Sequence, residues 1–516
     1  MAGIKALAKE TAVYGLSSIV GRFLNWCLVP LYVYMFPAEE YGIVSYLYSF
    51  TAVALVVLNY GMETGFFRFA NKTDDPDRVY TTALWSVGFT SMLFVLLLSI
   101  FIVPVSELML MADNASYVWL LGAIVAIDAF SNLPFAYLRF RKKAYRFAGI
   151  KLFNVGLNIG LNLLFILCCP ALMKGSWSWL VSWFYEPLGG EAFGIGWIFV
   201  ANMISTLAVM ACLLPEITRV SWRFDARLLR KMLSYSWPLL ILGVAGILSQ
   251  NMGQMIIPYL FIGQEEAARA MVGIYGANIK IAIVMVMFTQ AFRYAYEPFI
   301  FAQAKGDGEP RTAAYADAMK FFVIFGLLIF LAVMFYLPAI KYFVSPGYWA
   351  GLSVVPVMMA AELCFGIFFN LSVWYKLTDR TQWGMYMSLI CFVLMLVLNI
   401  WLVPAIGIPG GYMGSAWAAL ISYFAVMVLS WFVGRRYYPI PYHIGRLALY
   451  VLFAGVLYAA GMALDICFTG WVLYLTRTMM LVVYLGAVCY FENVPFSRGC
   501  RRFAPRCRRR RRKCSE

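Results

Sequence analysis

The sequence contains little charge and almost no histidine. Charged residues make up 13% of its 516 residues, and His443 is the single histidine. Because soluble globular domains carry about 25% charged residues, this composition excludes a soluble enzyme or binding domain. Instead, 63% of the residues are hydrophobic, and apolar runs of about 20 residues, the length that crosses a bilayer, recur along the chain. We therefore expect an all-α polytopic membrane protein.

The cysteines show neither the spacing of a metal site nor that of a disulfide framework. Most of the 11 cysteines lie in or at the ends of apolar runs, where they behave as small hydrophobic residues. We expect no metal and no cofactor.

Fourteen apolar segments are long enough to span a membrane, and the charges between them alternate from side to side. Of the 41 lysines and arginines, 34 fall on one side, three on the other and four inside spans. Cytoplasmic loops collect Lys and Arg, so both termini are expected in the cytoplasm. The predicted spans are 11–36, 43–66, 80–103, 117–138, 148–169, 195–214, 233–262, 272–300, 319–344, 350–375, 383–403, 412–434, 445–464 and 471–491.

A run of ten basic residues between Arg498 and Lys513 follows the last span. Such a run can contact anionic lipid, at about 1 kcal/mol per cation near the surface, or serve as a docking tail for a partner. We favour the lipid contact. Nucleic acid is not expected as a partner, because nothing folded accompanies the run.

The second half of the chain repeats short patterns of the first. Ile204–Met210 matches Ile421–Met427 at five of seven positions, and Gly273 echoes Gly42, each before an isoleucine. Six spans separate the copies, so both start on the same side, which predicts two six-helix lobes related by a parallel repeat. The predicted divisions are a first lobe at 1–218, a second lobe at 219–436, an accessory helix pair at 437–493 and a basic tail at 494–516.

Four basic residues stand inside apolar spans: Arg22, Lys280, Arg293 and Arg477. A cation near the bilayer centre costs roughly 2.5–3.5 kcal/mol, so it usually faces a cavity or a partner. Two of them in a common lumen would favour an anionic cargo, with structural ion pairs as the alternative. Arg293 can pair with Glu297 one turn later. Arg477 is expected to extend toward the membrane surface.

Acids inside spans offer a way to couple transport to protons or sodium, because burial and neighbouring charge shift a carboxyl pKa. The candidates are Glu63, Asp128, Glu297 and Glu362.

Asn154, Asn158 and Asn162 form a stripe on one face of the fifth span. Hydrogen bonding between helices explains such a stripe, and we favour it over a sugar-binding wall, with Asn158 kept as a candidate for substrate contact. The outside loop 175–194 is rich in aromatic residues. They are typical of a membrane-interface belt, with a carbohydrate platform as the alternative.

Five stretches of the chain have a recognisable pattern: Pro30–Gly42, Gly61–Phe69, Val272–Lys280, Gln290–Phe299 and Asn370–Asp379. They resemble one family of membrane proteins, the bacterial polysaccharide (Wzx-type) flippases. The resemblance is strongest in the second half and covers most of residues 10–435. The family belongs to the superfamily of multidrug, oligosaccharidyl-lipid and polysaccharide (MOP) exporters, and the chain looks like its Bacteroidetes-type branch. One departure is Gly253-Gln254, where span 7 of the family often carries an Asp-Arg pair.

The resemblance implies a flippase rather than an enzyme. Its cargo would be an undecaprenyl-pyrophosphate-linked oligosaccharide for O-antigen or other lipopolysaccharide synthesis, moved to the periplasmic leaflet of the bacterial inner membrane by alternating access. Because Arg binds phosphate through several hydrogen bonds, Arg22, Lys280 and Arg293 are the expected headgroup contacts. Anionic lipids and other polysaccharide-assembly membrane proteins are the expected partners.

Four alternatives remain. A multidrug or cation antiporter needs an acidic cavity, against which the central cations argue. A lipid II-type flippase carries a chemically similar headgroup. A polymerase or glycosyltransferase needs a large outside domain with catalytic residues, whereas the longest outside loop, 170–194, holds only Lys174, Glu186 and Glu191 as charges. A non-transporting scaffold has no reason to keep charges within the membrane.

Overall fold

The computed structural model describes residues 20–175, 178–220, 223–304, 312–378, 380, 382–467 and 470–492. All regular structure in these ranges is helical, without strands, which confirms the predicted fold class. In the described residues, 13 segments are long and apolar enough to cross a membrane. The remaining predicted span, 11–36, is described only from residue 20, and α2 (Leu28–Met35) forms its second part.

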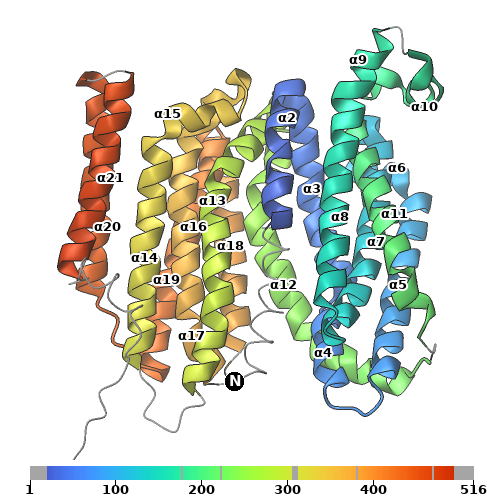
Figure 1. Cartoon of the computed structure of the whole chain (residues 1–516), viewed down its shortest axis with the longest axis horizontal. Helices are drawn as coiled ribbons and strands as arrows, with labels where there is room; N and C mark the ends of the chain where they lie inside the picture. The colour runs from blue at the N-terminus through green and yellow to red at the C-terminus, as the bar shows by residue number, and fades with distance from the viewer. Residues whose placement is uncertain are drawn as a thin grey trace, which may run out of the picture. The chain divides into compact units, whose positions relative to one another are not determined.

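The helices reproduce the predicted spans to within several residues (Figure 1). Short helices join the long ones at their ends. In chain order after α2 they are α3 (Ala38–Asn59), α4 (Met62–Ala70), α5 (Pro76–Ile100), α6 (Ile102–Leu108), α7 (Ala115–Phe140), α8 (Ala144–Leu163), α9 (Cys169–Met173), α10 (Ser182–Tyr185), α11 (Gly196–Thr218), α12 (Ala226–Leu260), α13 (Glu265–Ala304), α14 (Thr312–Phe335), α15 (Leu337–Ile340), α16 (Val354–Leu371), α17 (Val373–Leu377), α18 (Gln382–Ile406), α19 (Tyr412–Tyr437), α20 (Ile444–Cys467) and α21 (Trp471–Phe491).

The two halves of the chain meet where α3 crosses α13. A Cβ atom on Gly42 would lie 1.9 Å from the carbonyl oxygen of Arg269, and one on Gly273 would lie 2.0 Å from that of Ala38. The backbones therefore touch, as small residues permit at helix crossings in membranes. The same offset of 231 positions relates Arg269 to Ala38 and Gly273 to Gly42, so the two contacts are made by equivalent residues. The contact is thus reciprocal, which is what a parallel repeat predicts.

Loops from each half reinforce this contact at the end of the bundle where α3 and α13 begin, which we call the crossing end. The hydroxyl of Tyr348 donates to the carbonyl oxygen of Phe36 at 2.8 Å. In the same direction, Arg269 on α13 donates to the carbonyl oxygen of Leu110 at 3.1 Å. Hydrogen bonds from the second half to the first therefore hold the two halves together at this end.

Helix α12 opens the second half in the sequence, yet its first part packs on the first half. Ser236 donates to the carbonyl oxygen of Gly61 at 3.2 Å, and the guanidinium of Arg68 lies 3.9 Å from the centre of the Tyr235 ring. Helix α12 also packs on α18 of the second half. The first span mirrors this exchange, because its described part contacts α13. The predicted lobe boundaries remain a prediction, but the helices at the start of each half cross to the other.

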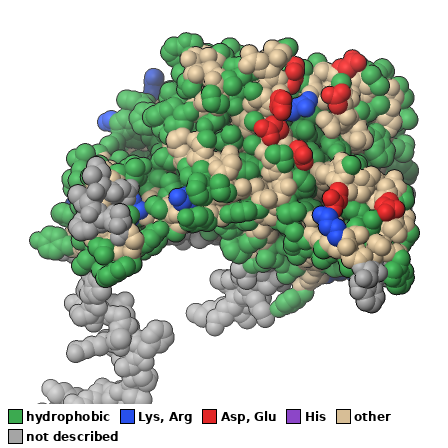
Figure 2. Space-filling view, turned by 90° about the horizontal axis from the view of Figure 1, so that it is seen from above, with side chains coloured by type: hydrophobic (Ala, Val, Ile, Leu, Met, Phe, Trp, Pro, Cys, Tyr) green, Lys and Arg blue, Asp and Glu red, His purple; other side chains and the backbone are tan. Residues whose placement is uncertain are grey.

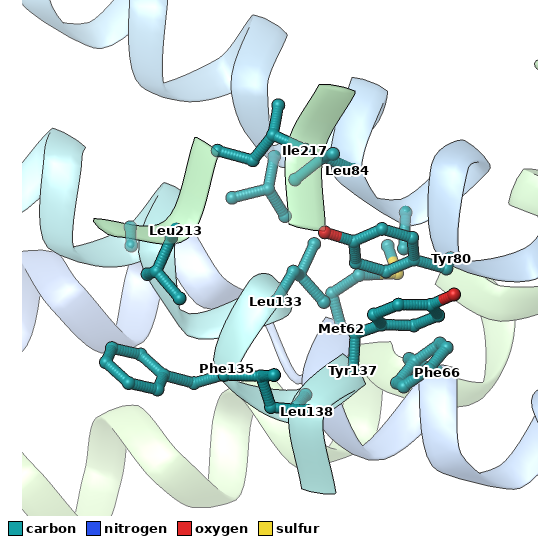
Figure 3. Packing of buried hydrophobic residues seen from close by; sticks show 14 of the residues in the cluster. Met62, Phe66, Tyr80, Leu84, Leu133, Phe135, Tyr137, Leu138, Leu213 and Ile217 are labelled. Carbon is teal, nitrogen blue, oxygen red and sulfur yellow. The ribbon is translucent and has the colours of Figure 1, made fainter. Parts of the chain in front are cut away.

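Aromatic and sulfur-containing side chains fill the core of the first half near α4. Tyr80 and Tyr137 stack with ring centres 4.3 Å apart, and Met62 and Phe66 pack in the same cluster (Figure 3). All four are nearly or fully buried. This packing fixes α4, α5 and α7 against one another.

Ala316–Pro338 and the chain from Tyr442 onward form a second compact unit, built from α14, α20 and α21. Arg477 on α21 is only 1% exposed and donates to the carbonyl oxygen of Phe335 at 2.9 Å. Phe335 ends α14, where carbonyls lack helical partners and a positive charge is favoured. The expectation that Arg477 extends to the membrane surface is therefore wrong. Helix α14, predicted within the second lobe, groups with the accessory pair.

A buried ion pair closes the other end of this unit. Lys320 donates to the carboxylate of Glu492, and their side chains are 9% and 8% exposed. Burial alone would raise the pKa of Glu492, but hydrogen bonds from Lys320 and Tyr450 hold that pKa below its ordinary value. The resulting stabilisation is present above the ordinary carboxyl pKa. It is lost as the pH falls through the lower pKa of the folded state.

We expect Glu492→Gln to destabilise this unit by about 3 kcal/mol at neutral pH, because it leaves Lys320 buried without its main partner. The difference from the wild type shrinks below about pH 4, where the carboxyl of the unfolded chain is itself protonated. Thermal unfolding of the purified protein at pH 7.5 and pH 3 measures both effects. Asp317→Asn is the control, because the Asp317 side chain is 58% exposed and its loss should change little. Equal melting temperatures of Glu492→Gln and Asp317→Asn would contradict the assignment of Glu492 as the main partner of Lys320.

Candidate functional site

A cluster of cationic and polar side chains lies where the first span meets α13. The guanidinium of Arg22 donates a hydrogen bond to the side-chain oxygen of Gln290. Arg293 follows Gln290 by three residues, so the two side chains are neighbours on the helix surface. The Arg293 guanidinium lies 4.6 Å from the centre of the Phe369 ring. We call Arg22, Gln290 and Arg293 the arginine cluster.

The arginine cluster places positive charge from both halves of the chain close together. Arg22 precedes α3 in the first half, whereas Arg293 lies on α13 in the second, and both side chains are exposed. Among the described residues, Arg22 has an amide oxygen as its partner and no carboxylate. An amide does not neutralise a guanidinium, so Arg22 keeps its full charge. Such a group can bind a phosphate through several charge-assisted hydrogen bonds.

Lys280 lies apart from this cluster. It precedes Gln290 by ten residues, about 15 Å along the axis of α13, and is half-buried. Its backbone carbonyl accepts a hydrogen bond of 2.7 Å from the indole of Trp26, which stacks on Phe343 with ring centres 4.3 Å apart. The structure therefore brings Arg22 to Gln290, one helical turn from Arg293, rather than to Lys280. A cargo contact for Lys280 stays a prediction.

The asparagine stripe takes part in a hydrogen-bond network between helices. Asn162 donates to the side-chain oxygen of Asn158 at 2.8 Å and accepts from the hydroxyl of Tyr32 at 3.0 Å. Asn158 in turn donates to Ser205 on α11 at 3.3 Å. The network ties α2, α8 and α11 together, so these contacts favour the helix-bonding interpretation. A sugar contact by Asn158 stays a prediction.

The second half contains a matching arrangement. Asn399 on α18 donates to the carbonyl oxygen four residues earlier at 2.8 Å, as Asn162 does on α8. Its side-chain oxygen accepts from Ser415 on α19 at 2.6 Å. Both asparagines are fully buried. The repeat predicted from the sequence therefore places equivalent side chains in equivalent roles.

We expect Asn162→Leu to lower the stability of the protein by about 1 kcal/mol, the usual size of a hydrogen bond between helices in a membrane. The leucine keeps the side-chain volume but loses the bonds to Tyr32 and Asn158. Thermal unfolding in detergent measures the change. Asn154→Leu, on the same helix and outside this network, is the control and should melt like the wild type. An equal drop in stability in both variants would mean that the loss of any polar side chain on this helix causes the effect, rather than the loss of this hydrogen-bond network.

The acidic candidates occupy different surroundings. Glu63 forms an ion pair with Arg139 on α7, which ties two helices together. Asp128 on α7 is half-buried and accepts a hydrogen bond of 3.3 Å from Thr206 on α11. Glu362 is half-buried on α16. The side chain of Glu297 lies outside the described residues, so its pairing with Arg293 stays a prediction.

Lys151 accompanies Asp128 in the first half. It is half-buried in the second turn of α8, its ammonium lies 4.1 Å from the centre of the Phe135 ring, and its charge acts on Asp128. The charge pattern of the sequence counts this lysine among the 34 loop cations, because it stands near the start of a predicted span. Of the acids described, Asp128 thus combines burial, a hydroxyl donor and a nearby cation. Within the described residues, no group of three or more His, Cys, Asp or Glu could hold a metal.

Sequence reasoning missed Gln290 and Trp26. Both contact the opposite half, and neither carries charge, so a search for intramembrane ions passes over them. Gln290 begins one of the stretches that resemble the flippase family, Gln290–Phe299. That resemblance was the available signal.

Comparison with known proteins gives a family match for the first part of the chain and a shared fold for most of it. Residues 7–149 match the family model described as "Polysaccharide biosynthesis protein". Among solved structures, the chain is similar to "Lipid II flippase MurJ, inward closed conformation", with 13% identity, a TM-score of 0.64 and coverage of 94% of this chain and 99% of that one. The chain has the fold of the MOP exporter superfamily. The resemblance predicted from the sequence is confirmed at this level.

Other structures with the MOP fold lie at similar distances. A multidrug resistance MATE family transporter of the MOP superfamily in an inward-facing conformation has 15% identity, a TM-score of 0.60 and coverage of 81% of this chain and 94% of its own. A MOP superfamily transporter from Pyrococcus furiosus Vc1 (DSM3638) has 16% identity, a TM-score of 0.55 and coverage of 83% and 95%. No curated protein matches significantly.

Proposed function

We propose that the protein is a flippase that moves a polyprenyl-pyrophosphate-linked oligosaccharide between the leaflets of the bacterial inner membrane. The matched family model concerns polysaccharide biosynthesis, and the shared fold includes a lipid II flippase. Both support a transporter of a lipid-linked saccharide rather than an enzyme. In its more specific form, the proposal names undecaprenyl as the lipid carrier and O-antigen as the polysaccharide made from the glycan.

The arginine cluster is the observation that carries the proposal. A pyrophosphate cannot enter an apolar environment unpaired. Arg22 and Arg293 come from opposite halves of the chain, so an anion bound by both would connect the halves. Rearrangement of the halves about this point would change which leaflet the anion faces. The polyprenyl chain needs no protein partner, because it can stay in the bilayer.

The charges at the two ends of the helix bundle indicate which end faces the periplasm, and from this we infer the direction in which cargo moves. At the crossing end, acids stand in the first turns of α3 and α13, Glu39 with Glu40 and Glu265 with Glu266, and Figure 2 shows acidic side chains on this face. The basic loops lie at the opposite end. Because cytoplasmic loops are basic, we assign the crossing end to the periplasm. The structure then corresponds to a state closed toward the periplasm, which receives cargo from the cytoplasmic leaflet.

Ion coupling is a further part of the proposal, and Asp128 is the first residue to test. In our account, protonation of Asp128 weakens its attraction for Lys151 and changes how α7 and α8 pack. We expect Asp128→Asn to bind cargo like the wild type but to lose stimulation of flipping by an imposed proton gradient. Flipping in proteoliposomes with and without the gradient measures this. Glu63→Gln is the comparison, because a structural pair should change stability rather than the response to the gradient.

A cation antiporter is the alternative with the same fold, since multidrug transporters share it. Its cargo is positively charged, and the arginine cluster repels such a cargo. In host cells that lack the protein, our proposal predicts loss of surface polysaccharide and accumulation of its lipid-linked precursor in the cytoplasmic leaflet. Unchanged polysaccharide together with increased sensitivity to cationic drugs would favour the antiporter.

The basic tail, residues 494–516, lies outside the described residues. Its binding to anionic lipids, and any docking to other polysaccharide-assembly proteins, stay predictions.

A further inference from the structure

A cavity of about 250 Å³ lies beside the end of the first span, where the turn after α8, α9 and the start of α11 meet. Figure 1 places α9 and α10 together at the crossing end of the molecule. Phe36 closes the cavity from the first span. The other aromatic and charged lining residues come from the segment after α8 and from the first turn of α11: Phe165, Lys174, Tyr185, Glu191 and Trp197.

The aromatic wall of the cavity is fixed in place. Tyr185 and Trp197 stack with ring centres 4.7 Å apart and planes 13° from parallel. Phe165 packs on Trp197 with ring centres 4.8 Å apart, and the Trp197 indole donates to the carbonyl oxygen of Gly190 at 2.8 Å. Tyr185 and Trp197 are each only 2% exposed. The wall is therefore preformed, unlike the exposed aromatics of the same loop, such as Trp183.

Three polar groups accompany this wall. Lys174 and Glu191 form an ion pair of 3.2 Å, with side chains that are 75% and 55% exposed. The hydroxyl of Tyr185 has no hydrogen-bond partner among the described residues, although its ring is buried. Burial raises the pKa of Tyr185 to about 12, so the hydroxyl remains a hydrogen-bond donor at physiological pH.

This combination selects among ligand classes. Ligand sites typically pair an apolar or aromatic lining with a few placed polar groups. A hydrocarbon chain would make no hydrogen bonds to the Lys174 ammonium and the Glu191 carboxylate at the edge of the cavity. A simple anion would be repelled by the Glu191 carboxylate. A sugar offers apolar C–H faces to aromatic rings and hydroxyls that both donate and accept. The sugar therefore fits all parts of the lining.

We propose that this cavity is a saccharide subsite that binds one unit of the glycan carried by the protein. The inference rests on the proposed function and adds a second contact for the same cargo. Phe36 lies 14 residues after Arg22 on the first span, about 21 Å along a helix. A single sugar cannot bridge that distance, so the cargo that reaches both sites carries an oligosaccharide of several units.

Saturation-transfer NMR on the full-length protein in lipid nanodiscs tests the subsite. The probe is the free oligosaccharide released by mild acid from the polyprenyl-linked pool of the host, so no pyrophosphate is present. We expect transfer to the sugar protons with the wild type and a loss of at least fivefold in a Lys174→Gln, Glu191→Gln double variant. These side chains are exposed, so the variant should fold. Tyr185→Phe, which removes only the hydroxyl, should also weaken the signal.

Two controls separate this inference from neighbouring ones. Trp183→Ala removes an aromatic that is 74% exposed and does not line the cavity, and it should leave the signal unchanged. Lys341→Gln removes a cation that does not line the cavity, and it should also leave the signal unchanged. The subsite is refuted if the wild type gives no signal, if the double variant equals the wild type, or if Trp183→Ala loses as much. Flipping by a protein that binds no free glycan would reject the subsite but keep the proposed function, and glycan binding without flipping would do the reverse.

Discussion

Gly42→Leu should reduce flipping by at least about a hundredfold. The Cβ atom of any side chain at this position would lie 1.9 Å from the backbone oxygen of Arg269. A backbone atom cannot turn aside as a flexible side chain can. Overpacking of a fitted contact costs about 3 kcal/mol, and each 1.4 kcal/mol is a factor of ten in an equilibrium. The arrangement closed at the crossing end would therefore be almost unpopulated, and a carrier that cannot reach one of its states cannot complete its cycle.

The same reasoning applies to the mirrored position, and the chain offers a matched control. A Cβ atom on Gly273 would lie 2.0 Å from the carbonyl oxygen of Ala38, so Gly273→Leu should behave like Gly42→Leu. Gly156 on α8 has no atom within 4 Å of the position of its missing Cβ. Gly156→Leu should therefore flip cargo at nearly the wild-type rate. Equal activity of Gly42→Leu and Gly156→Leu would contradict the crossing of α3 and α13.

Arg22→Gln should also reduce flipping by about a hundredfold while leaving the protein folded. A charge-assisted hydrogen bond contributes about 1.5–3 kcal/mol, and a guanidinium can give a phosphate two of them. Glutamine keeps a polar group near Gln290 but loses the charge. Because Arg22 is exposed, little packing is lost. Flipping in proteoliposomes and binding of polyprenyl pyrophosphate measure the two effects together.

Two further variants define the chemistry at Arg22. Arg22→Lys keeps the charge but not the planar fork, and lysine is not equivalent at a bidentate site. We expect it to recover part of the activity. Lys341→Gln removes a cation next to Trp349 and away from the arginine cluster, so it should have no effect. A similar loss in Lys341→Gln and Arg22→Gln would point to overall charge rather than to a site.

The membrane-spanning helices could be predicted from the sequence because hydropathy and length decide them. Their partners could not, because packing between helices in a membrane depends on shape. Arg477 illustrates this limit: its position near a helix end suggested contact with the membrane surface, but the carbonyl of Phe335 on another helix accepts its hydrogen bond. Nothing in the sequence around Arg477 specifies that partner.

The candidate site was predicted in part. Intramembrane cost singled out Arg22 and Arg293, and the structure places both beside Gln290. The same argument singled out Lys280 as a third headgroup contact, because the sequence does not tell which turn of α13 the first span meets. The close contact of α3 with α13 at Gly42 sets which turn of α13 lies beside the first span. In the sequence, only the repeated pattern at Gly42 and Gly273 indicated that contact. If the matching glycines Gly42 and Gly273 are interpreted as a helix contact, the alignment of the first span along α13 follows.

Leaflet exchange of a fluorescent polyprenyl-pyrophosphate oligosaccharide in proteoliposomes tests the central claim most directly. The wild type is predicted to speed exchange well above that of protein-free liposomes, with Arg22→Gln and Gly42→Leu near the protein-free rate. Exchange no faster than in protein-free liposomes, with the glycan of the host and with an imposed proton gradient, would contradict the account. Transport of a lipophilic cation by the same preparation would then identify an antiporter with the MOP fold.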